Sequence, residues 1–249
     1  MSTTKLTIGY LYKEEMNLYG DNGNIEVMLD RARRRGIQTE VIVIDTTTNP
    51  NDPSLKGVNF MFMGGGSDYS QRETYQDFIT NKKQLLQSYV EEGKTGLYIC
   101  GAYQLMGNYY KSADGSVLKG LEIFDIYTQH FGYSKQRCTG NVLAELTNSA
   151  IKGPTSVVGF ENHGGRTYLG TGCKPFATLK FGFGNNGEDN TEGLLYKNSL
   201  CTYLHGPLVA RNPHIADYLL AKALNVDKLE QLDDSLIYDA HTASTKLKQ

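Results

Sequence analysis

The chain has 249 residues, of which 21% are charged and 39% hydrophobic, and its formal net charge is -2. This near-neutral balance argues against proteins that bind polyanions or membrane surfaces through a strongly basic face. No apolar run approaches the roughly 20 residues that cross a bilayer. The N-terminal segment also lacks the basic start and apolar core of a signal peptide.

Four cysteines are scattered along the chain, with no C-x-x-C pair among them. They are Cys100, Cys138, Cys173 and Cys201. This spacing does not resemble a disulfide framework, so free thiols in a reducing compartment are expected. We therefore predict a cytoplasmic protein. A single domain over residues 1–249 is a separate prediction, which rests on the absence of a linker along the chain.

The first half of the chain alternates between apolar and amphipathic segments. Strands are predicted at 6–12, 40–45, 59–63 and 96–99, and helices at 24–35 and 68–92. Alternation of this kind predicts a parallel sheet that is covered by helices on both faces.

The second half is richer in β-structure. Strands are predicted at 121–129, 139–146, 156–162, 175–184, 193–198 and 200–206, and two closing helices at 213–224 and 235–247. No repeat or linker separates the halves. The predicted fold class is α/β, with a central, mostly parallel sheet flanked by helices.

The segment GLYICGAYQLMG, residues 96–107, places Cys100 where a predicted strand joins a predicted helix at 102–110. Open α/β sheets bind ligands at the carboxyl ends of their strands. The amino end of a helix favours a thiolate. The layout matches a nucleophile elbow with cysteine as the nucleophile. The alternative is an inert core cysteine, which is common in cytosolic proteins.

A nucleophilic thiol needs a base, and His205 is the candidate. It closes the apolar run LCTYL, so it reaches the same sheet edge as Cys100 if the strands are parallel. A Cys-His pair suits acyl transfer. Alternatively, Cys201 and His205 bind a metal, although one pair alone is weak evidence. His163 is a rival base, and His214 is predicted to be a solvated helix residue.

A glycine-rich loop in MGGGSDYSQRE, residues 63–73, also follows a strand and opens a helix. Its amides could stabilise an oxyanion, or the loop could be a flexible connection. It lacks the Lys-Ser/Thr ending of a phosphate-binding loop.

Four arginines lie near the predicted end of the first helix, at positions 31, 33, 34 and 35. Cations suit a helix carboxyl end, and the net charge gives nucleic-acid binding little support. We expect a solvated helix end.

Together, five segments resemble the class I glutamine amidotransferases, and more closely their cobyric-acid-synthase-like branch. They are NLYGDNGN, GGGSD, ICGAYQ, GFENHGGRT and TYLHGP, which follow one another along most of the chain. Within that branch, GFENHGGRTYLG, EGLLYKN and TYLHGP are most similar to the GatD family, the glutaminase subunits of lipid II isoglutaminyl synthases.

The resemblance implies a flavodoxin-like glutaminase domain. In it, Cys100 would attack the side-chain amide of L-glutamine to give a γ-glutamyl thioester, and His205 would move the protons. Backbone amides of Gly65 and Gly101 would hold the oxyanion. Arg137 would pair with the α-carboxylate of the substrate.

Two positions depart from the family pattern. Ala102 stands where the elbow usually has glycine, and Pro207 stands where most class I members carry the glutamate that orients the histidine. An acid from elsewhere, including a partner subunit, is therefore expected to orient His205.

The resemblance also implies a partner, because the chain has no phosphate loop. A MurT-like Mur ligase subunit would bind ATP and Mg²⁺ and form a heterodimer with this chain, which would itself hold no cofactor or metal. The complex would convert the D-glutamate α-carboxylate of membrane-bound lipid II to D-isoglutamine. The alternatives are a glutaminase for another acceptor, such as a corrin, or a non-catalytic module that senses glutamine.

Overall fold

A six-stranded sheet forms the centre of the protein in the computed structural model, which describes residues 5–247. Its order is β13 (Leu194–Tyr196), β14 (Ser199–Thr202), β4 (Thr95–Ile99), β3 (Phe60–Met63), β1 (Lys5–Leu11) and β2 (Gln38–Ile44). All neighbouring strands are parallel except β13, which runs antiparallel to β14. The mostly parallel central sheet agrees with the sequence prediction.

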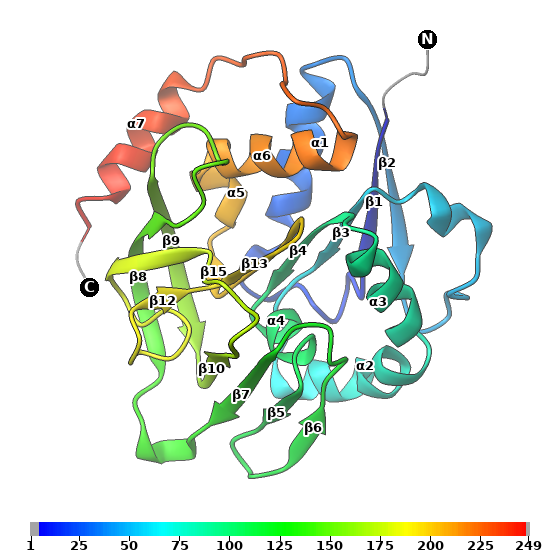
Figure 1. Ribbon diagram of the computed structural model, residues 1–249, viewed down its shortest axis with the longest axis vertical. Helices are drawn as coiled ribbons and strands as arrows, with labels where there is room; N and C mark the ends of the chain where they lie inside the picture. Colours follow the sequence, from blue (N-terminus) through cyan, green and yellow to red (C-terminus); the bar gives the residue numbers. More distant parts are fainter. Residues whose placement is uncertain (1–4, 248–249) are drawn as a thin grey trace.

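Helices cover both faces of this sheet (Figure 1). The connection from β1 to β2 through α1 (Gly23–Arg33) runs one way along the sheet. The connection from β3 to β4, through α2 (Asp68–Thr80) and α3 (Lys83–Glu91), runs the other way. Because such crossovers are right-handed, α1 lies on the face opposite α2 and α3. The inner strands β3, β4 and β14 are buried along their whole length, which explains their continuous apolar runs.

Three helices complete the chain, namely α5 (Leu208–Arg211), α6 (Pro213–Leu224) and α7 (Ser235–Ser244). Helix α6 contacts α1, β1 and β4, and α5 contacts α1, α6 and α7. No helix within residues 5–247 is long and apolar enough to span a bilayer.

Two smaller sheets lie beside the carboxyl edge of the central sheet (Figure 1). One has the order β10 (Gly165–Leu169), β7 (Ile126–His130), β5 (Tyr109–Lys111) and β6 (Val117–Lys119). The other has the order β12 (Thr191–Glu192), β11 (Ala177–Phe181), β8 (Cys138–Leu146), β9 (Ser156–His163) and β15 (Leu204–His205). Short 3-10 turns complete the structure as η1 (Leu18–Gly20), η2 (Pro53–Gly57) and η3 (Gly132–Ser134).

Several predicted elements differ from those observed, among them the strand predicted at 121–129, which begins only at Ile126 as β7. The predicted helix at 68–92 is two helices, which meet at residues 81–82. The predicted helix at 102–110 is only α4 (Gly101–Leu105), because Gly107 ends it and the β-prone Tyr109 and Tyr110 enter β5. The predicted strand at 200–206 is divided at Tyr203 into β14 and β15, which belong to different sheets.

The expectation of a solvated arginine cluster is wrong for Arg35, whose side chain is 2% exposed and pairs with Asp217 at 2.8 Å, and it is also wrong for Arg31. Its side chain is 2% exposed, and its two terminal nitrogens donate to both carboxylate oxygens of Asp234 at 2.8 and 2.7 Å. Its Nε donates to Asp217 at 2.8 Å. Arg31 thus ties α1 to α6 and to the segment before α7, a long-range contact that helical periodicity does not indicate.

Replacement of Arg31 by alanine is expected to lower the free energy of unfolding by about 3–5 kcal/mol, because the buried carboxylate of Asp234 would lose its partner, whereas Asp217 would keep its contact with Arg35. Arg33→Ala is the matched control: Arg33 is exposed on the same helix and should change stability by less than about 1 kcal/mol. Denaturant unfolding of both variants measures the difference. Equal losses for the two would show that the buried ion pairs contribute little.

Candidate active site

Cys100 occupies a strained turn between β4 and α4. Its φ of 52° and ψ of -103° lie outside the regions that non-glycine residues favour, which costs about 1–3 kcal/mol and is typical of functional sites. A Cβ on the next residue, Gly101, would lie 2.8 Å from Nε2 of Gln71 and 3.1 Å from the amide nitrogen of Gly66. The turn therefore needs glycine there, and it has the form of a nucleophile elbow.

Ala102, the departure from the usual glycine, is fully buried within α4. Its methyl group is accommodated in the packed first turn of that helix.

His205 reaches the same place by a different route from the one predicted. β14 runs parallel to β4, with Thr202 beside Ile99, and the chain then leaves the central sheet so that β15 pairs with β9. A Cβ built on Gly65 would lie 3.0 Å from Cε1 of His205 and 3.3 Å from Cβ of Cys100. The two predicted reactive residues therefore converge on the glycine-rich loop.

Asp21 is the residue that sequence reasoning missed. Its Oδ1 accepts the Nδ1 proton of His205 at 2.8 Å, and its Oδ2 accepts the amide of Gly65 at 2.7 Å. Both Asp21 and His205 are fully buried. The acid that orients the histidine thus comes from this chain, 184 residues away in the sequence, and not from the position after His205.

Pro207, which stands at the position where most class I members carry the acid, packs against the segment that carries Asp21. A Cβ on Gly23 would lie 2.3 Å from Cγ of Pro207, so this glycine allows close packing of the two segments. Asn24 accepts the amide of Val209 at 3.1 Å. The motif NLYGDNGN therefore combines an acid with the small residues that let it approach His205.

Electrostatics around His205 favour its protonated form. Burial alone would lower the pKa of His205, but the hydrogen bond to Asp21 and the neighbouring Cys100 outweigh burial and raise that pKa to about 10. The imidazole thus carries a proton at neutral pH, next to the sulfur of Cys100.

The glycine-rich loop differs in one respect from the sequence prediction. The amide of Gly65, expected to face an oxyanion, donates instead to Asp21. The Gly65 carbonyl accepts the amide of Leu18 at 2.9 Å, which fixes the orientation of the following peptide. The amide of Gly66 belongs to that peptide and lies beside Gly101. Gly65 therefore holds the acid through its amide, and the loop amide that lies beside the elbow is that of Gly66.

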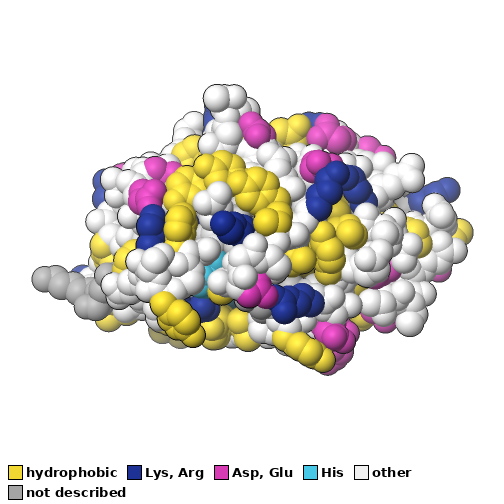
Figure 2. Space-filling view, turned by 90° about the horizontal axis from the view of Figure 1, so that it is seen from below, with side chains coloured by type: hydrophobic (Ala, Val, Ile, Leu, Met, Phe, Trp, Pro, Cys, Tyr) yellow, Lys and Arg dark blue, Asp and Glu magenta, His cyan; other side chains and the backbone are white. Residues whose placement is uncertain are grey.

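A pocket of about 450 Å³ opens over Cys100. It is lined by Tyr19, Gly66, Cys100, Arg137 and Asn162 among others. The predicted substrate-binding residue Arg137 therefore shares a cavity with the predicted nucleophile. The face seen in Figure 2 is hollowed, with a histidine visible inside the hollow and Lys and Arg side chains close to it.

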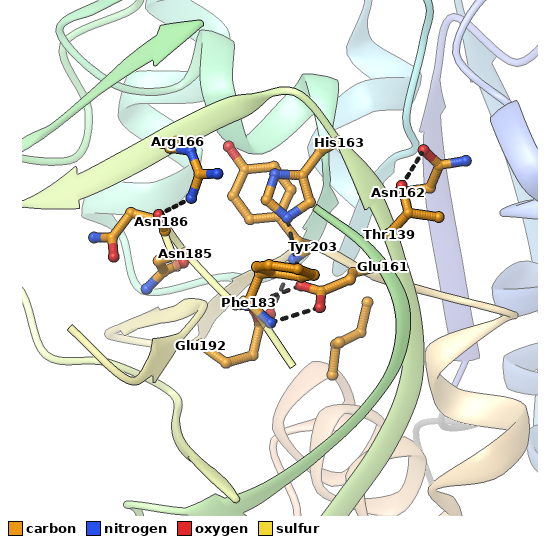
Figure 3. A network of polar contacts seen from close by, with 12 residues as sticks. Thr139, Glu161, Asn162, His163, Arg166, Phe183, Asn185, Asn186, Glu192 and Tyr203 are labelled. Carbon is orange, nitrogen blue, oxygen red and sulfur yellow. Dashed lines mark hydrogen bonds and ion pairs between the residues drawn. The ribbon is translucent and has the colours of Figure 1, made fainter. Parts of the chain in front are cut away.

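The two other histidines considered lie in different settings. His163 stacks on Tyr203 with 3.7 Å between ring centroids, and its Nδ1 donates to the Gly165 carbonyl at 2.7 Å (Figure 3). Burial lowers the pKa of His163. The residue also lines the pocket over Cys100 and so forms part of its wall. The prediction of a solvated His214 is wrong, because His214 is 3% exposed and burial lowers its pKa to about 4.

A buried carboxylate network lies behind the stacked His163 and Tyr203 (Figure 3). Glu161 accepts the amides of Phe183 and Gly184 at 2.6 and 2.8 Å, and thereby fixes the loop after β11. Within residues 5–247, no group of three or more His, Cys, Asp or Glu is placed to hold a metal ion.

Comparison with known proteins agrees with this geometry. Residues 7–213 match the model of the CobB/CobQ-like glutamine amidotransferase domain. The chain is 41% identical to the GatD subunit of lipid II isoglutaminyl synthase (glutamine-hydrolyzing) from Staphylococcus aureus, with 88% of this chain and 84% of that protein covered. It is 34% identical to the GatD subunit from Streptococcus pneumoniae, with 88% and 81% covered.

Solved structures show the same fold. A glutamine amidotransferase from Thermotoga maritima superposes with a TM-score of 0.56 at 16% identity, and the match covers 96% of this chain and 92% of that one. The family match, the two relatives and this fold agree with one another, and the chain belongs to the CobB/CobQ-like family of glutamine amidotransferase domains.

Proposed function

We propose that this chain is the glutaminase subunit of a lipid II isoglutaminyl synthase. The observation that carries the proposal is the convergence of Cys100, His205 and Asp21 at one pocket, in a chain that is 41% identical to a GatD subunit over most of both proteins. The proposed reaction is hydrolysis of L-glutamine to L-glutamate and ammonia.

The thiolate of Cys100 attacks the side-chain amide carbon of L-glutamine, which forms a C–S bond and an oxyanion. Amides of Gly66 and Gly101 would hold that oxyanion, since the Gly66 amide lies beside Gly101, the residue that follows Cys100. His205 then donates its proton to the leaving nitrogen as the C–N bond breaks. Water that is deprotonated by His205 hydrolyses the γ-glutamyl thioester and regenerates the thiol.

Asp21 acts in this scheme as a positioning residue. It holds Nδ1 of His205, so that Nε2 is the nitrogen that exchanges protons with the sulfur and the leaving group. Arg137 would bind the α-carboxylate of L-glutamine at the other side of the pocket.

The ammonia would be used by a second subunit. A MurT-like Mur ligase would supply ATP and Mg²⁺ and activate the D-glutamate α-carboxylate of lipid II, while this chain would carry no cofactor. The free thiols of all four cysteines suit a reducing cytoplasm, where we place the complex.

The test follows nitrogen from glutamine to the acceptor. The chain, a MurT-like subunit, ATP, Mg²⁺ and lipid II are incubated with glutamine labelled with ¹⁵N in its side-chain amide. We expect the label in the D-isoglutamine amide, with one glutamate released per amide formed. Glutamate release with all of the label in free ammonia would contradict the proposed acceptor, and no release would contradict the glutaminase.

A further inference from the structure

Asn162, on β9, holds the guanidinium group of Arg137. Nε of Arg137 donates to Oδ1 of Asn162, and Nη2 donates to the Asn162 carbonyl oxygen at 3.1 Å. Arg137 is otherwise an exposed, long side chain whose free rotamers would have to be ordered by each substrate molecule. The two contacts to Asn162 hold the guanidinium group of Arg137 in place before a substrate molecule binds.

These contacts also fix which way the Asn162 amide faces. Nε of arginine can only donate, so the atom that faces it is the oxygen. Thr139 donates to the same Oδ1 at 3.3 Å, on the side of β9 away from Glu161 and His163 (Figure 3). The two amide hydrogens on Nδ2 of Asn162 therefore point elsewhere, and Nδ2 has no partner among the described residues.

Asn162 is half-buried and lines the same pocket as Cys100 and Arg137. The Nε edge of the guanidinium group is occupied, which leaves Nη1 of Arg137 and Nδ2 of Asn162 as donors that no described residue contacts through a hydrogen bond. A carboxylate has two oxygens and is bound best by two converging donors. A neutral amide beside a cation supplies the second donor without adding charge.

We propose that Asn162 is a substrate-binding residue: it orders Arg137 through its two oxygens and donates from Nδ2 to the α-carboxylate of L-glutamine. The inference rests on the proposed function for the identity of the ligand. It makes Asn162 a determinant of glutamine affinity and leaves the chemistry at Cys100 unchanged.

Asn162→Asp is the informative variant, because it keeps the acceptors for Arg137 but replaces the donor with an anionic oxygen. L-Glutamine binding is measured by calorimetry in a Cys100→Ala background, where no turnover interferes. We expect Asn162→Asp to raise the Kd for L-glutamine at least about tenfold, the size of one lost hydrogen bond to a charged group. Thr139→Val removes only the weaker of the two contacts to Oδ1, at 3.3 Å, and should change Kd less than about threefold.

A second readout separates recognition from damage to the fold. With Cys100 intact, kcat/KM is measured for L-glutamine and for 4-aminobutanamide, which lacks the α-carboxylate. Asn162→Asp should lower the value for L-glutamine and leave that for 4-aminobutanamide unchanged. An unchanged Kd in Asn162→Asp, no measurable binding of L-glutamine to the Cys100→Ala parent, or equal losses of kcat/KM for both substrates would overturn the inference. Binding that depends on Asn162 without any glutamate release would instead contradict the proposed glutaminase.

Discussion

Replacement of Cys100 by alanine is expected to reduce kcat for glutamate release from L-glutamine by about 10⁵-fold or more, as expected when the nucleophile of a catalytic triad is removed. The reason is that the thioester cannot form without the sulfur at the elbow. L-Glutamine should still bind, because the residues that line the rest of the pocket are untouched.

Cys173→Ala is the matched control for this variant. Cys173 is the one thiol of the four that is partly exposed, and it does not line the pocket over Cys100. Its replacement should leave kcat unchanged, as measured by an enzyme-coupled glutamate assay. A Cys100→Ala protein with more than a few per cent of wild-type turnover would point to hydrolysis by activated water.

Asp21→Asn is expected to lower kcat by about 10²–10⁴-fold, the range seen when the orienting acid of a triad becomes an amide. Asp21 accepts two hydrogen bonds, from His205 and from Gly65. Asparagine has one acceptor oxygen and must present its NH₂ group to the other donor. Either the histidine or the glycine-rich loop then loses its partner.

The same variant should shift the pH profile. Because the pKa of His205 is raised to about 10, wild-type kcat/KM should fall on the alkaline side as pH passes through that region and His205 loses its proton. Asp21 contributes to raising that pKa, so Asp21→Asn should move the alkaline limb to lower pH. A variant with nearly wild-type kcat and an unmoved limb would mean that another acid, for instance one from a partner subunit, orients His205.

The central sheet and the elbow could be predicted from sequence because their signals are local. Apolar runs at regular spacing indicate buried parallel strands, and a cysteine before Gly101 indicates a tight turn at a strand end. These features depend on residues within a few positions of one another, and the structure agrees with them at β1, β3 and β4.

Asp21 could not be predicted because its signal is not local. It pairs with a histidine 184 residues away, and its own segment gives no indication of which residue it faces. The family pattern directed attention to the position of Pro207, where an acid is usually found. In this chain that proline packs against Gly23, and so helps to bring the acid from the opposite end of the chain.

The buried ion pairs of Arg31 were missed for the same physical reason. The arginine run is local and resembles a solvated helix end, whereas its partners Asp217 and Asp234 come from distant segments. Division of the second half into two sheets was also not predictable, since the break at Tyr203 has no glycine or proline to mark it.

Identification of the covalent intermediate tests the central claim most directly. Protein quenched in acid during turnover of L-glutamine is digested, and its cysteine peptides are analysed by mass spectrometry. The account predicts a γ-glutamyl adduct on the peptide that contains Cys100 and on none of the peptides with Cys138, Cys173 or Cys201. Steady glutamate release with no adduct on Cys100, or with an adduct on another cysteine, would contradict it.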